Sequence, residues 1–64
     1  MKTLKVSRVI DLLRKDGWEI VRWKGDHRQF KHKNKSGTVT VNGKPNDDLD
    51  AFLLNSIWKQ AGWK

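Results

Sequence analysis

The first part of the chain carries apolar residues at the spacing of one helix face. Four apolar positions recur at intervals of three and four residues: Val6, Val9, Ile10 and Leu13. Charged residues fill most positions between them, so the pattern predicts an amphipathic helix. Thr3 or Ser7 is the expected N-terminal cap, and Gly17 is the expected left-handed residue that ends the helix. Trp18, directly after Gly17, is expected to fold back against Leu13.

The middle of the chain changes to a pattern that is typical of strands. Aromatic and β-branched residues alternate with polar ones, and glycine-containing turns interrupt them. The predicted strands are residues 18–24, about 28–33 and 38–41, with turns at 24–27 ("KGDH") and 33–37 ("KNKSG"). In the third strand, Val39 and Val41 share one face. These segments predict three antiparallel strands.

The last third of the chain returns to a helical pattern. Its apolar stripe consists of Leu53, Leu54, Ile57, Trp58 and Ala61. Three acids precede the stripe, namely Asp47, Asp48 and Asp50. Acids in this position cap free backbone amides, so we interpret them as structural residues rather than metal ligands. Gly62 is the predicted stop of this helix, after which Trp63 is expected to fold onto Trp58.

The predicted order is therefore α-β-β-β-α, an α+β fold in which two helices cover one face of a three-stranded antiparallel sheet. The other face of the sheet is left open. No linker divides the sequence, so we expect one domain over residues 1–64. The chain has no cysteine and no apolar run near the ~20 residues that span a bilayer. We therefore expect a soluble protein of the cytoplasm without membrane attachment.

Charge is distributed very unevenly along the chain. The net charge is +7, and residues 1–35 hold all of this excess, with eleven Lys or Arg against four acids. Six of these cations lie between residues 22 and 35, where Asp26 is the single acid. Such a concentration favours a polyanionic partner through counterion release, and nucleic acid is the first candidate. A solvated, solubilising face is the alternative interpretation.

The sequence holds few candidates for catalysis. It has no phosphate-binding glycine motif, no metal-ligand spacing and no nucleophile triad, which leaves His27 and His32. In a regular strand these two residues point to opposite faces, so a nuclease site would use one histidine. RNA permits this because a single base can take the proton of its 2′-hydroxyl, and imidazole titrates near neutral pH. From composition and spacing alone, an ordinary hairpin residue remains the simpler interpretation of His27.

Three segments together resemble a known family. "DGWEIVRWKGDHRQFKH" (16–32) is similar to the signature of the HicA toxins, and "VTV" (39–41) and "LLNSIWKQAGW" (53–63) are similar to that family's third strand and closing helix. HicA toxins are small endoribonucleases of toxin–antitoxin pairs. The resemblance implies a fold like the double-stranded RNA-binding domain, with His27 as the catalytic residue, mRNA as the substrate and a HicB-type antitoxin as the partner.

The chain departs from the family pattern at three places. Asp26 stands where the family generally has serine, and its carboxylate can either hold His27 or repel a phosphate. Asn42 and Lys44 stand where the family often has proline and a second histidine. Phe52 and Leu53 replace Gly-Thr at the start of the second helix, which predicts an earlier helix start at the Asp47–Asp50 cluster. His32 is expected to buttress the sheet on the face of Phe30.

These observations lead to one hypothesis and two alternatives. We expect an endoribonuclease (mRNA interferase) that needs no metal or cofactor, with His27 as general acid/base and Asp26 as a possible modulator. The expected RNA contacts are Arg22, Lys24, Arg28, Lys31, Lys33 and Lys44. The first alternative is a non-catalytic module of the same fold that binds double-stranded RNA.

The second alternative is a protein–protein element with exposed aromatic residues. In a regular strand residues 19, 21 and 23 face one side and residues 18, 20 and 22 face the other. Trp18 and Trp23 therefore cannot both be buried against the helices. An exposed Trp23 would stack on a base or anchor an antitoxin, whereas a packed Trp23 would cover the edge of the core.

Overall fold

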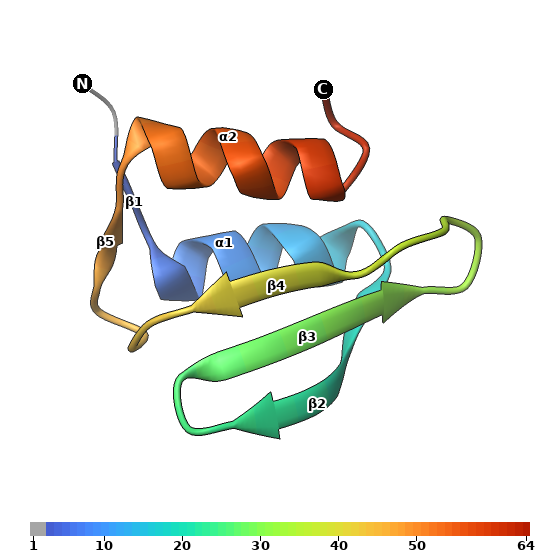
Figure 1. Cartoon of the computed structure of the whole chain (residues 1–64), viewed down its shortest axis with the longest axis horizontal. Coiled ribbons are helices and arrows are strands. Elements are labelled where there is room, and N and C mark those ends of the chain that lie inside the picture. The colour runs from blue at the N-terminus through green and yellow to red at the C-terminus, as the bar shows by residue number, and fades with distance from the viewer. Residues whose placement is uncertain (1–2) are drawn as a thin grey trace.

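A computed structural model describes residues 3–64 of the chain (Figure 1). The elements follow one another as β1 (Leu4–Lys5), α1 (Val6–Lys15), β2 (Trp18–Lys24), β3 (His27–His32), β4 (Val39–Asn42), β5 (Asp48–Leu49) and α2 (Ala51–Gln60). The predicted α-β-β-β-α layout is confirmed. The short strands β1 and β5 were not predicted, and they pair with each other antiparallel beside the helices.

The main sheet has the strand order β2-β3-β4, and both of its strand pairs are antiparallel. Helices α1 and α2 lie on the same side of this sheet, and the opposite side is open (Figure 1). The core between sheet and helices consists of Val6, Val9, Leu13, Trp18, Phe30, Val39, Val41, Leu49, Leu54, Ile57 and Ala61. Val39 and Val41 are both fully buried, as their shared face predicted. Within residues 3–64, neither helix has the length and apolar character needed to cross a membrane.

Helix α1 is capped differently from the prediction. The N-cap position is Lys5, and its side chain makes no capping hydrogen bond, so the expected caps at Thr3 and Ser7 are wrong. Backbone carbonyls take their place, because the amide of Val6 donates to Asp47 O at 2.9 Å and the amide of Ser7 donates to Pro45 O at 3.1 Å. The loop after β4 therefore supplies the acceptors that the first turn of the helix needs.

Helix α2 confirms the structural role of the acidic cluster. The Asp50 carboxylate accepts a hydrogen bond from the Leu53 amide, so Asp50 is the N-cap. Asp47 accepts from the Lys44 amide within the preceding loop, and Asp48 forms an ion pair with Lys5. The predicted apolar stripe is wrong at Leu53, which is 44% exposed. This follows from the helix phase, which turns the first residues of α2 away from the sheet.

The end of α2 is as predicted. The amide of Trp63 donates to Trp58 O at 2.8 Å, which closes the last turn, and the two indole rings lie 5.2 Å apart. The corresponding end of α1 has Gly17 at a φ of +101°. A Cβ at position 17 would lie 2.8 Å from Nε2 of His32, so glycine is needed there for space as well as for its backbone angle.

A β-bulge in β2 changes which residues face the helices. Ile20 pairs with Phe30 and Arg22 pairs with Gln29, so Val21 has no partner in β3. Before the bulge, alternate residues face the core in the expected order. After it the alternation is shifted by one residue, so Trp23 lies on the same face as Trp18. The expected regular alternation along this strand is wrong for that reason.

Candidate nucleic-acid interface

His27 opens β3 immediately after the tight turn at Gly25 and Asp26. It pairs with Lys24 of β2 on one side and with Asn42 of β4 on the other. Its neighbours in β3 alternate between exposed and buried, and His27 is exposed. Since Arg28 and Phe30 face the helices, His27 projects from the open face of the sheet.

Two cations and one amide surround His27 on this face. Arg22, Lys24, His27 and Gln29 line a depression of about 280 Å³, which we call the His27 pocket. Arg22 faces Gln29 and Lys24 faces His27 across the β2–β3 pair, so the four side chains come from two adjacent cross-strand pairs. The pocket offers positive charge and a titratable imidazole side by side, which suits a phosphodiester.

The bulge at Val21 is responsible for this arrangement. In a regular strand Arg22 and Lys24 would share the face of Trp18 and point toward the helices. Because Val21 is an additional residue, Arg22 and Lys24 lie instead on the open face beside His27. The sequence analysis predicted these residues as RNA contacts but did not identify the bulge or the contribution of Gln29.

The other predicted RNA contacts are placed more loosely. Lys31 is exposed and has the same orientation along β3 as His27, opposite Glu19 of β2. Lys33 is exposed in the turn after β3, and Lys44 is exposed in the loop after β4. Asp26 is exposed as well. The ion pairs described within residues 3–64 join other residues, so none ties the Asp26 carboxylate to His27.

Arg28 is not part of the His27 pocket. It is 3% exposed and lies on the helix side of the sheet. Its Nη1 donates to Gly43 O at 2.7 Å and to Asp26 O at 3.5 Å, and its guanidinium lies 5.2 Å from the ring centre of Trp23. A buried guanidinium needs such acceptors because it has no neutral form. Arg28 thus joins the turn before β3 to the loop after β4.

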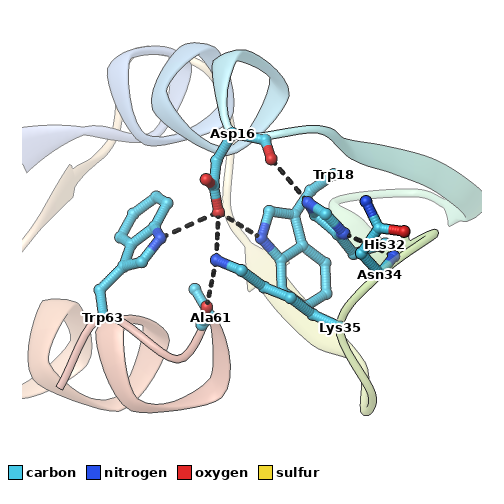
Figure 2. Close-up of polar contacts among 7 residues, drawn as sticks. All are labelled: Asp16, Trp18, His32, Asn34, Lys35, Ala61 and Trp63. Atoms are coloured by element: carbon cyan, nitrogen blue, oxygen red, sulfur yellow. Dashed lines mark hydrogen bonds and ion pairs between the residues drawn. The ribbon is translucent and has the colours of Figure 1, made fainter.

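His32 lies at the other end of β3 and has a structural environment. Nε2 lies 2.6 Å from Asp16 O, and Nδ1 accepts from the Asn34 amide at 3.0 Å (Figure 2). The ring also stands edge-on to Trp18, with centres 5.2 Å apart. Since Nδ1 accepts, the proton resides on Nε2, which donates to the carbonyl. The expectation that His32 buttresses the sheet on the face of Phe30 is confirmed.

Asp16 is the centre of a polar cluster that the sequence analysis missed. Its Oδ2 accepts from Lys35 Nζ at 2.7 Å, from Trp63 Nε1 at 3.0 Å and from Trp18 Nε1 at 3.1 Å (Figure 2). The hydrogen bond from Lys35, followed by that from Trp63, lowers the pKa of the Asp16 carboxyl below its ordinary value. This cluster fastens the C-terminal end of the chain to the end of α1.

Fold and surface together define a class of small α+β protein: two helices back a three-stranded sheet whose open face presents a histidine among cations. Within the described residues, no three His, Asp or Glu side chains gather where they could hold a metal ion. The chain matches the family model described as HicA toxin of bacterial toxin–antitoxin systems over residues 6–63. It therefore belongs to the HicA toxin family, as the resemblance predicted, and its general role is that of a toxin. A search of curated proteins finds no match.

Proposed function

We propose that this toxin is an endoribonuclease that cleaves mRNA, with His27 as its general acid/base. One observation carries the proposal: the exposed His27 imidazole shares a pocket with Arg22 and Lys24 on the open face of the sheet. A catalytic imidazole must be reachable by its substrate, and a phosphodiester needs compensating positive charge close to the base.

The proposed reaction uses the nucleophile that RNA itself carries. His27 takes the proton of a ribose 2′-hydroxyl, and the 2′-oxygen attacks the adjacent phosphorus. The bond from phosphorus to the 5′-oxygen breaks, and the departing oxygen takes up a proton from solvent. The products are a 2′,3′-cyclic phosphate and a free 5′-hydroxyl. Arg22 and Lys24 stabilise the charge that develops on the phosphoryl oxygens. This route requires no metal or cofactor.

The surrounding residues have subordinate roles in this proposal. Lys31, Lys33 and Lys44 contact phosphates farther along the RNA, since all three are exposed. Asp26 modulates His27 through its charge, at the turn that precedes the histidine. Arg28 is left out of the RNA contacts because it is buried and hydrogen-bonded to backbone carbonyls. A HicB-type antitoxin neutralises the toxin by covering the open face, and both act in the cytoplasm.

The test compares the wild-type protein with His27→Ala on single-stranded RNA in the presence of EDTA. General acid–base catalysis typically contributes about 10²–10⁴-fold, so we expect the cleavage rate to fall by that factor. The products of the wild-type protein should carry 2′,3′-cyclic phosphate ends. His32→Ala is the matched control, and its activity per folded molecule should remain close to that of the wild type. Equal cleavage by His27→Ala would overturn the mechanism, and binding without cleavage by both proteins would support the non-catalytic RNA-binding module.

A further inference from the structure

Trp23 is exposed and yet held in one orientation. It is 63% exposed at the end of β2, close to the turn that precedes His27. Its Nε1 donates to Gly25 O at 2.8 Å, which fixes the ring edge. The Arg28 guanidinium lies over the ring at 5.2 Å from its centre. Two contacts of different kinds therefore fix an aromatic ring at the surface.

The burial of Arg28 shows which side of the ring is available. Arg28 is 3% exposed, so the ring face that it covers points into the protein. The large exposed area of Trp23 must then come from the opposite face and the edges of the indole. A ligand that stacks on this outer face would meet a ring whose orientation is already fixed. Such a ligand would not have to order a mobile side chain.

Charge around Trp23 favours nucleic acid over a protein partner. Lys24 follows Trp23 in the chain and lies on the other side of the sheet, in the His27 pocket with Arg22. Because β2 is an edge strand, no further strand separates the pocket from the ring along this edge. The excess charge of +7 in residues 1–35 attracts a polyanion to the same end of the molecule.

We propose that the outer face of Trp23 is a stacking site for one unpaired base of single-stranded RNA whose neighbouring phosphate occupies the His27 pocket. The backbone of the RNA passes around the β2 edge, so phosphate and base contact opposite sides of the same strand. A base in a duplex is stacked on its neighbours and cannot bind in this way. This proposal rests on RNA being the substrate, and it adds that the substrate is unpaired at the cleavage site.

The experiment measures binding separately from cleavage. The probe is a short single-stranded oligoribonucleotide with 2′-O-methyl groups, which has no 2′-hydroxyl to attack. Its affinity is measured for the wild-type protein, Trp23→Phe and Trp23→Leu. Phenylalanine retains an aromatic face but loses the hydrogen bond to Gly25, whereas leucine loses both. Stacking of one base is typically worth roughly 5- to 100-fold in affinity. We expect a loss of that size for Trp23→Leu and a clearly smaller one for Trp23→Phe.

Two controls make the result specific to stacking. Phe52→Leu removes another exposed aromatic ring, 81% exposed on α2, and should leave RNA affinity unchanged. An oligonucleotide with abasic positions should bind the wild-type protein more weakly than the intact one, while Trp23→Leu should no longer distinguish the two. A duplex of the same sequence should bind the wild-type protein and Trp23→Leu equally.

The outcome is independent of the catalytic role of His27. If Trp23→Leu folds and binds the single strand as tightly as the wild-type protein, the stacking site is wrong, and the ring remains available to a protein partner. Should cleavage persist in His27→Ala while Trp23→Leu weakens binding, the mechanism fails and the stacking site stands. Trp23→Phe keeps the test valid if leucine disturbs folding, because abasic discrimination by the phenylalanine variant is still expected.

Discussion

His27 and His32 lie at the two ends of the same strand, but their surroundings differ completely. His27 projects from the open face into a pocket with Arg22 and Lys24. Both ring nitrogens of His32 are occupied, one by the Asp16 carbonyl and the other by the Asn34 amide. The comparison shows that strand geometry, rather than residue type, decides which histidine can exchange protons with a substrate.

The environment of His32 also opposes protonation. A second proton would have to reside on Nδ1, where it would face the amide hydrogen of Asn34. His32 is thereby held as the neutral tautomer that donates from Nε2. Because His27 has an exposed ring, it is not restricted to one such form. Four predictions follow from this contrast, from the largest expected effect to the smallest.

Gly17→Ala should disturb the enclosed side of the comparison most strongly. The new Cβ would lie 2.8 Å from His32 Nε2 at a φ of +101°. Left-handed strain and displacement of the histidine should together lower the free energy of unfolding by about 3 kcal/mol. Urea unfolding followed by circular dichroism measures this. The matched control is Gly25→Ala beside His27, where φ is +58° and no atom lies within 4 Å, so only about 1 kcal/mol should be lost.

Replacing each histidine by alanine should separate stability from activity. His32→Ala leaves the Asp16 carbonyl and the Asn34 amide without their side-chain partner and removes the contact with Trp18. We expect a loss of about 2 kcal/mol in unfolding free energy. His27→Ala should change stability by less than about 0.5 kcal/mol, as for other exposed residues. Equal destabilisation by the two substitutions in thermal unfolding would contradict the contrast.

The two arginines of the hairpin extend the same comparison. Arg28→Met removes the buried donor to Gly43 O and should destabilise the protein by about 1.5–2 kcal/mol. Arg22→Met should leave stability nearly unchanged but weaken RNA binding and reduce its salt dependence by about one unit of slope. The measurements are unfolding curves and RNA affinities over a series of salt concentrations. A reversed pattern would mean that Arg28, and not Arg22, contacts the RNA.

Asp16→Asn should have the smallest effect, and that effect should depend on pH. The Asp16 side chain is about one-third exposed, so solvent screens its interactions. Because the folded-state pKa is lowered, the ionised carboxylate stabilises the fold above its unfolded pKa of about 3.9. This stabilisation is lost as the pH falls through the folded-state pKa. Thermal unfolding should therefore show a lower Tm for Asp16→Asn at pH 7 and a shrinking difference below about pH 4. A constant difference across this range would exclude the proposed ionic contribution.

The fold was largely predictable because periodicity reports directly on burial. The apolar spacing in residues 6–13 and the valine pair in β4 located the core side of their elements correctly. The candidate site was predictable only in part. Nothing in the local pattern distinguishes buried Arg28 from exposed Arg22, since the acceptors of Arg28 include Gly43, fifteen residues away. The Asp16–Trp63 contact spans 47 residues and likewise has no local signal.

The unpaired Val21 makes the length of β2 as informative as its composition. Removing Val21 alone would leave every other residue of the strand opposite its present partner in β3. Losing one residue elsewhere between Trp18 and Lys24 would instead exchange inward and outward side chains over part of the strand. Natural variants of this toxin that differ in length here are therefore expected to gain or lose their residue at position 21, while the spacing between Arg22 and His27 stays constant.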